Sequence, residues 1–133
     1  METLQPLESR ILSFDPGETT GISFILNGDF VWGMVSKPMF FGRNSFLQGL
    51  IVMSQPNLVI IEKPPLVPKF PNKDQMTVYN RLEKFFSVAG FKVLTPNPGQ
   101  WKGLVERTDI SCTHIKDAAD MAKAIYAQKA ATT

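Results

Sequence analysis

The chain has 133 residues, of which 44% are hydrophobic and 20% charged, the size and composition of one globular domain. This balance excludes a disordered tail, a collagen and a coiled coil, and no apolar run is long enough to span a bilayer. A lone Cys112 excludes an internal disulfide framework and a cysteine zinc site, and it fits a reducing compartment. We therefore expect a single domain over 1–133, with its core at about 10–128, in the cytoplasm and with no membrane partner.

The first third of the chain predicts an antiparallel meander of three strands. Arg10–Asp15 is the first strand and is ended by Pro16-Gly17, and the apolar run at 21–26 is the second. Asn27-Gly28 is a strong hairpin signal, after which 30–35 returns as the third strand.

The remainder predicts helices that alternate with strands. In chain order these are a helix capped by Asn44 or Ser45, a strand at 58–61, a helix from Asn72 to Gly90, a strand at 91–95 and a helix at about 114–128. Apolar residues recur at helical spacing in all three helices: Phe46, Leu47, Leu50 and Ile51; Met76, Tyr79, Leu82, Phe86 and Ala89; Ile115, Ala119, Ala122 and Tyr126. The order βββαβαβα predicts an α/β fold with a mixed five-stranded sheet flanked by helices.

Two carboxylates stand at the ends of predicted strands. Asp15 ends the first strand at a tight Asp-Pro-Gly turn, and Glu62 follows four aliphatic residues. Ligands of α/β sheets bind at the carboxyl ends of the strands, so both positions are candidates for a site. Each also has an ordinary explanation, as an Asp that shapes a turn and as an exposed Glu after a strand.

A third signal lies at the start of the last helix, in the sequence His114-Ile-Lys-Asp117-Ala-Ala-Asp120. A spacing of three residues places Asp117 and Asp120 on neighbouring ridges of the helix, with His114 one step earlier along the same side. Acids near a helix N-terminus can simply balance its dipole. The small Ala118 and Ala119, however, allow the helix to approach the sheet closely and to bring these acids near the strand ends.

Together these signals predict a cluster of four carboxylates, which would repel one another unless cations bind among them. Oxygen ligands, with no cysteine and at most one histidine, favour Mg²⁺ or Mn²⁺ over zinc. Two such ions can activate a water and stabilise the leaving oxygen of a phosphoryl displacement. The implied chemistry is phosphodiester hydrolysis, with no small-molecule cofactor.

The residues that carry these signals resemble the RuvC-like Holliday junction resolvases of the ribonuclease H-like superfamily. The resemblance lies in 11–17, 59–62 and 117–122, and in order and spacing it extends from about 10 to 127. It implies a ribonuclease H-like fold, a homodimer and Mg²⁺-dependent paired nicking of four-way DNA junctions in recombination, and the small size suggests a phage-encoded member. It also implies that the metal ligands and catalytic residues are Asp15, Glu62, Asp117 and Asp120.

The last helix allows two registers for its metal ligands. Some relatives use a His-x-x-Asp pattern, and here both His114-x-x-Asp117 and Asp117-x-x-Asp120 are present. We favour Asp117 with Asp120, because the small and apolar residues that follow at 121–125 match the family pattern. Asp117 is a ligand in either register.

The formal net charge of +2 hides an uneven distribution. Residues 63–107 carry eight cations and three anions, a local balance of +5, whereas the remainder carries −3. This basic block is a possible phosphate-facing surface, although a solvated helix and loop would look the same. Within it, four prolines exclude helix interior or central strand over 63–72. The candidate DNA contacts are Lys69, Phe70, Lys73 and Lys102, of which Phe70 could stack in an opened junction.

Two other functions remain open from the sequence. Related nucleases that process ribosomal RNA precursors share the Asp-Pro-Gly opening, so structured RNA is an alternative substrate. A protein of the same fold could also bind nucleic acid without cutting it.

Overall fold

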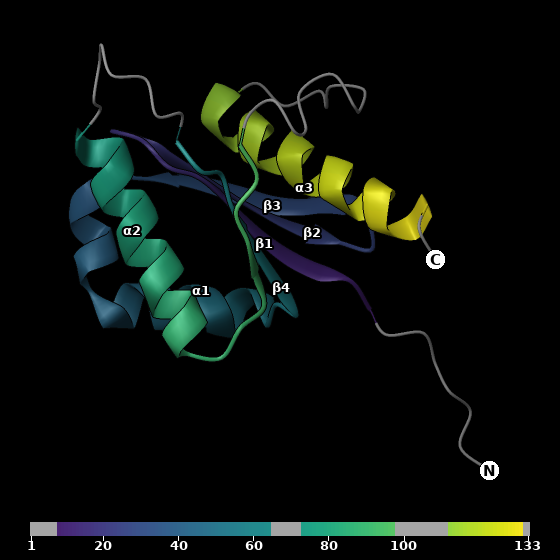
Figure 1. The fold of residues 1–133 in the computed structure, drawn as a ribbon, viewed down its shortest axis with the longest axis horizontal. Coiled ribbons are helices and arrows are strands. Elements are labelled where there is room, and N and C mark those ends of the chain that lie inside the picture. The colour runs from purple at the N-terminus through teal and green to yellow at the C-terminus, as the bar shows by residue number, and fades with distance from the viewer. Residues whose placement is uncertain (1–7, 65–72, 98–111, 132–133) are drawn as a thin grey trace.

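The computed structural model describes residues 8–64, 73–97 and 112–131, which form a mixed five-stranded sheet between helices (Figure 1). The strand order is β3-β2-β1-β4-β5, with antiparallel pairing among the first three strands and parallel pairing of β4 with β1 and β5. The strands are β1 (Arg10–Asp15), β2 (Thr20–Leu26), β3 (Asp29–Ser36), β4 (Leu58–Ile61) and β5 (Val93–Leu94). The α/β fold with a mixed five-stranded sheet is therefore confirmed.

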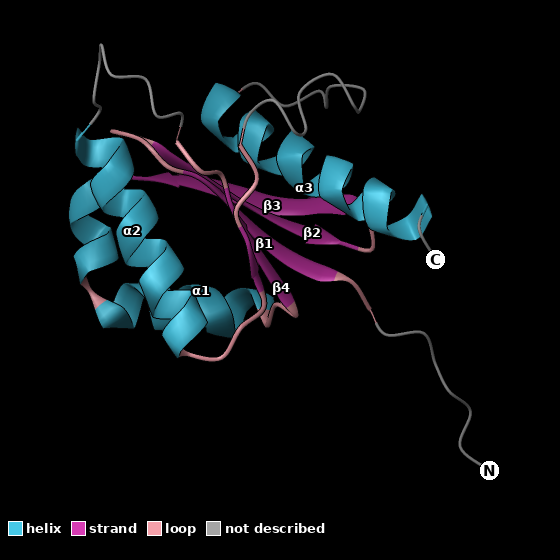
Figure 2. Cartoon of the chain, in the orientation of Figure 1, coloured by secondary structure: helices cyan, strands magenta, loops and turns pink. Residues whose placement is uncertain are grey.

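Helices cover both faces of this sheet (Figure 2). Of the helices in the described part of the chain, α1 and α2 lie on one face and α3 lies on the other. The helices are α1 (Asn44–Ser54), α2 (Lys73–Val88) and α3 (Thr113–Ala131), and a short 3₁₀ helix, η1 (Pro38–Gly42), precedes α1. Among the described residues, no helix is long and apolar enough to cross a membrane.

The side chains of β1 alternate between the two faces and so join two separate cores. Leu12 and Phe14 pack with residues of α1 and α2, including Leu47 and Phe86. Ile11 packs on the opposite face with Ala119 and its neighbours in α3. Strand β4 is buried on both faces, as its continuous aliphatic run predicted. The two central strands, β1 and β4, are thus held from both sides, which gives the site that follows them a rigid support.

The predicted hairpin is confirmed. Asn27 and Gly28 both have positive φ, 51° and 88°, as a two-residue turn of type I′ requires. A register shift between Phe24 and Ile25 lets β3 bulge at the edge of the sheet.

Four local predictions were wrong. Neither Asn44 nor Ser45 caps α1: the cap position is Arg43, which makes no side-chain cap hydrogen bond, and the Asn44 side chain instead accepts a hydrogen bond from Arg81. The last strand is only Val93–Leu94. Helix α2 buries Val78 with Leu82 and Phe86, whereas Ala89 is exposed beyond the helix end. The buried stripe of α3 is wider than predicted, because it also includes Ala118, Met121, Ala124 and Ile125.

Candidate active site

Asp15 and Glu62 lie side by side at the carboxyl ends of the two central strands. β1 and β4 run parallel with Phe14 opposite Ile61, and the Glu62 N–H donates to the Phe14 carbonyl at 3.0 Å. Side chains alternate along a strand, so Asp15 follows Ser13 and Glu62 follows Ile60 onto the face covered by α3. The parallel pairing therefore places side by side, at the backbone, two acidic residues that are 47 positions apart in the sequence.

The turn after Asp15 is held by its own backbone and by a buried threonine. Thr20 is fully buried, and its Oγ1 lies 3.3 Å from both the amide nitrogen and the carbonyl oxygen of Gly17. Gly21 then returns opposite Asp15 in the antiparallel pairing of β1 with β2. This tight return fixes the Asp15 backbone at the carboxyl end of β1, where Asp15 lines one cavity with residues from the start of α3.

Helix α3 lies unusually close to the sheet, because the residues beneath it are small. A Cβ atom on Gly21 would lie 1.9 Å from the carbonyl oxygen of His114, and a Cβ on Gly33 would lie 2.3 Å from the Ile115 side chain. Two sheet hydroxyls also donate hydrogen bonds to helix carbonyls: Ser13 to Ala118 at 2.8 Å and Ser23 to Ile115 at 2.9 Å. These contacts set the distance between α3 and the sheet and the position of α3 along the strands.

The acidic residues of α3 lie at different depths. His114 is exposed, Asp117 is half-buried and Asp120 is fully buried. Glu62 is also buried, with 6% of its surface exposed. Burial of a charged carboxylate is costly unless the charge is paired, hydrogen-bonded or bound to a metal. Each of the four predicted ligands has an interaction within the protein.

A cavity of about 410 Å³ opens at the end of β1 and the start of α3. Asp15, His114 and Asp117 line it, so the structure brings together three of the five side chains named from the sequence. Glu62 and Asp120 are not part of this lining and lie buried in the protein. The cavity is completed by residues that sequence reasoning missed: Pro16, Gly17, Glu18, Thr19, Gln75 and Thr113.

The donor set fits a hard divalent cation in its chemistry, because it consists of carboxylates with one histidine and no thiolate. Across the described ranges 8–64, 73–97 and 112–131, however, no three His, Cys, Asp or Glu side chains are grouped closely enough to hold a metal ion. The residues predicted as ligands thus lie at the ends of β1 and β4 and in α3, but they are not grouped as a metal site in this structure. Both registers of the last helix stay open as predictions.

No protein-family model matches the sequence, and no curated protein resembles it closely enough to count as a match. Solved structures do match. The Thermus thermophilus RuvC in complex with Holliday junction substrate superimposes with a TM-score of 0.73 at 13% identity, covering 93% of this chain and 97% of that one. This chain has the RuvC fold. A second Thermus thermophilus RuvC structure gives a TM-score of 0.69, also at 13% identity, with 92% and 97% of the chains covered.

A more distant similarity links the chain to the fowlpox virus resolvase in complex with Holliday junction DNA. The TM-score is 0.43 at 20% identity, with 70% of this chain and 64% of that chain covered. The resemblance to RuvC that the sequence motifs predicted is confirmed at the level of the ribonuclease H-like fold.

The DNA contacts predicted from the basic block are not placed in this RuvC fold. Lys69, Phe70 and Lys102 lie outside the described residues, and of Lys73 only the backbone, at the start of α2, is described. One cation of the block is used within the protein: Arg81 Nε donates to the Phe41 carbonyl at 2.8 Å, and its guanidinium lies over the Phe85 ring. Part of the local positive charge therefore supports the fold.

A pattern in the sequence could have predicted where α3 packs against the sheet. Ser13, Gly21, Ser23 and Gly33 are small residues on one face of three adjacent strands, at positions where a buried sheet face normally carries large aliphatics. In this RuvC fold such a face marks the place where a helix packs against the sheet.

Proposed function

We propose that this protein is an endonuclease that cuts four-way DNA junctions by paired symmetrical nicks. The proposal is supported by a RuvC fold in which Asp15 ends β1, Glu62 follows β4, and Asp117 and Asp120 lie in α3. A protein of that fold, the Thermus thermophilus RuvC, was solved in complex with Holliday junction substrate. Fold alone does not determine function, so the acidic site is the feature that the experiments address.

Asp15, Glu62, Asp117 and Asp120 are the residues that would hold Mg²⁺, two ions per site, with Mn²⁺ as a substitute and His114 as the alternative ligand. When bound, such ions supply an activated water and stabilise the leaving oxygen of the phosphodiester. The protein orients the scissile phosphate in the cavity beside Asp15 and Asp117. The close packing of α3 on Gly21 holds the start of the helix beside the end of β1.

Paired nicks need two sites, and a two-fold homodimer would present them to a substrate with the same symmetry. We therefore include a homodimer on branched DNA in the proposal, in the setting of recombination or the removal of branched intermediates.

The central test is cleavage by the wild-type protein and by Asp15→Asn of a panel that contains a four-way junction, a fork, a flap and a linear duplex. With Mg²⁺ or Mn²⁺ we expect selective junction cleavage by the wild type and loss of cleavage, with junction binding retained, in Asp15→Asn. The matched control is Asp29→Asn, an exposed aspartate at the far end of the β2–β3 hairpin, which should leave cleavage unchanged.

The panel also separates the alternatives. RNA hairpins and duplexes are tested beside this panel. If they are cut in preference to the junction, the substrate is structured RNA and not the DNA junction. Junction binding without cleavage, together with no Mg²⁺ or Mn²⁺ binding by isothermal titration, would overturn the nuclease and favour a non-catalytic binding protein. Loss of folding in Asp15→Asn, measured by thermal melting, would assign Asp15 a structural role.

A further inference from the structure

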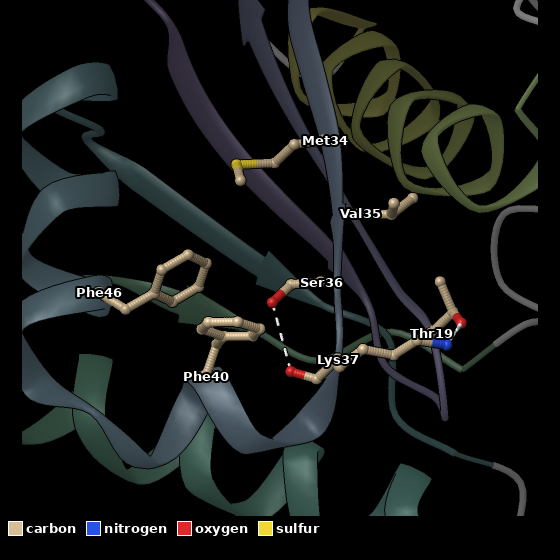
Figure 3. Close-up of a pocket in the computed structure, with 7 residues that line it drawn as sticks. All are labelled: Thr19, Met34, Val35, Ser36, Lys37, Phe40 and Phe46. Carbon is tan, nitrogen blue, oxygen red and sulfur yellow. Dashed lines mark hydrogen bonds between the residues drawn. The ribbon is translucent and has the colours of Figure 1, made fainter.

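A second hollow adjoins the acidic cavity, at the edge of the sheet beside β3. It measures about 340 Å³ and is mainly apolar, with Met34, Val35, Phe40 and Phe46 in its lining (Figure 3). Its polar lining consists of Thr19, Ser36 and Lys37. We propose that this hollow, here called the β3 groove, binds one unstacked nucleobase of the DNA strand whose phosphate enters the acidic cavity. The proposal rests on the function proposed above and deepens it.

The β3 groove and the candidate active site share one lining residue. Thr19 lines both hollows, and it lies in the turn that follows Asp15. The Lys37 Nζ donates to the Thr19 Oγ1 at 2.9 Å, and Figure 3 shows the Lys37 side chain extending from the Phe40 side of the groove toward Thr19. A nucleotide strand that places a phosphate beside Asp15 therefore has the groove as its next neighbour on the Thr19 side.

The lining suits a base rather than a phosphate. Phe40 is 39% exposed although it is a large aromatic residue, and its ring stands 5.8 Å from that of Phe46. An exposed aromatic face stacks on a nucleobase of any sequence. The volume lies at the lower end of the roughly 300–1,000 Å³ of small-molecule pockets, which suits a single base. With few polar groups in the lining, we expect weak discrimination among bases.

The charges around the groove favour DNA over a second copy of this chain. Lys37 lines it, and the Arg43 guanidinium lies 5.9 Å from the centre of the Phe40 ring. Residues 30–61 contain these two cations and no acidic residue. A two-fold contact through the groove would bring like charges together, which is unfavourable, whereas a strand of DNA brings phosphates to them.

The test uses four-way junctions in which one nucleotide at a time, around the cut, is replaced by an abasic site. One position should lower single-turnover cleavage by the wild type by about 5- to 150-fold, the range that corresponds to about 1–3 kcal/mol for stacking of a base on an aromatic ring. Phe40→Ala should cut the intact junction about as slowly as the wild type cuts the junction with the abasic site. The abasic site should not slow cleavage by Phe40→Ala any further. Phe40→Leu, which keeps the apolar volume, should lie between the two and guards against misfolding.

Binding gives a readout that does not depend on cleavage. With 2-aminopurine placed in turn at each nucleotide around the branch point and no divalent metal present, binding of the wild type should change the fluorescence at one position, and Phe40→Ala should abolish that change. The matched control is Met53→Ala, which truncates an exposed apolar residue on α1 and should behave as the wild type in both assays.

The possible outcomes separate this inference from the proposed function. If the wild type cuts junctions and no abasic position interacts with Phe40, the β3 groove proposal is wrong while the nuclease stands. If the wild type cuts nothing but 2-aminopurine responds through Phe40, the groove stands and the nuclease fails. Conversion of a dimer to monomers by Phe40→Ala, without any base dependence, would assign the groove to a contact between copies and overturn the proposal.

Discussion

At the scale of single residues, the depth of each acid in the structure bears on which side chains bind metal. Asp120 is fully buried on α3, whereas His114 is exposed at the rim of the cavity beside Asp15 and Asp117. Burial of a carboxylate is costly unless its charge is paired, hydrogen-bonded or bound to a metal, so a buried acid suits a metal ligand. The sequence preference for Asp117 with Asp120 therefore remains our prediction.

The register is tested by comparing Asp120→Asn with His114→Gln. We expect Asp120→Asn to lose Mn²⁺ binding, measured by isothermal titration, and to lose junction cleavage by at least about 100-fold, which corresponds to about 2.7 kcal/mol of transition-state stabilisation. His114→Gln should retain both within a few fold. The reverse pattern would assign the metal site to His114 with Asp117.

Gly21 is the residue at which the sheet and the active-site helix come closest. A methyl group there would overlap the His114 carbonyl, whose oxygen would lie 1.9 Å from the new atom, so the start of α3 must move. We expect Gly21→Ala to lower the free energy of unfolding by about 1–3 kcal/mol, as overpacking typically does. Cleavage should fall more than junction binding, because Asp117 moves away from Asp15.

The control for Gly21→Ala is Gly49→Ala within α1, where an added Cβ meets no atom within 4 Å. That change should raise the free energy of unfolding by about 0.5–1 kcal/mol, because alanine favours a helix over glycine. Equal behaviour of the two variants in chemical denaturation would show that α3 does not depend on Gly21 for its position.

At the scale of elements, the connection between the sheet and α3 decides whether the site assembles. The Ser13 and Ser23 hydroxyls donate to the Ala118 and Ile115 carbonyls, which flank Asp117 on the same helix. These hydrogen bonds act on the helix that carries two of the predicted ligands and leave the ligands themselves untouched. They are therefore positioning contacts.

Replacement of both hydroxyls tests this role. Each of Ser13→Ala and Ser23→Ala should cost about 0.5–1.5 kcal/mol of stability, and in the double variant cleavage should fall while junction affinity holds. Excess Mn²⁺ should partly restore the rate if the loss arises from weaker metal binding. Ser87→Ala removes an exposed hydroxyl that bonds Glu83 on α2 and should change neither property. A double variant with wild-type kinetics would show that these two hydrogen bonds do not position the site.

At the scale of the whole molecule, the proposed paired nicks depend on two subunits. Wild-type protein mixed with an equal amount of Asp15→Asn should form mixed dimers that cut only one strand. Singly nicked junctions should therefore accumulate, as resolved on denaturing and native gels. Wild type mixed with Asp29→Asn should give paired cuts. A monomer at all concentrations in sedimentation, with or without junction DNA, would contradict the dimer.

The sequence by itself determined the order of the elements and the positions of the two strands that became central in the sheet. The alternating and continuous apolar runs of β1 and β4 are local patterns, so they predicted where Asp15 and Glu62 leave the sheet. The hairpin at Asn27-Gly28 was predictable for the same reason, because its turn chemistry lies in two adjacent residues. The motif 117–122 on the last helix completed the resemblance to RuvC, which the fold confirmed.

Only the tertiary structure decided how closely α3 approaches the sheet, how deep each acid lies and that a second hollow meets the site at Thr19. The Ser13 hydroxyl bonds a helix carbonyl 105 residues away, and Gly21 accommodates the backbone of His114. Phe40 and Thr19 come together because β2 begins opposite the end of β3, where Thr20 pairs with Ser36. Such contacts join residues far apart in the chain, and neither periodicity nor local spacing contains them.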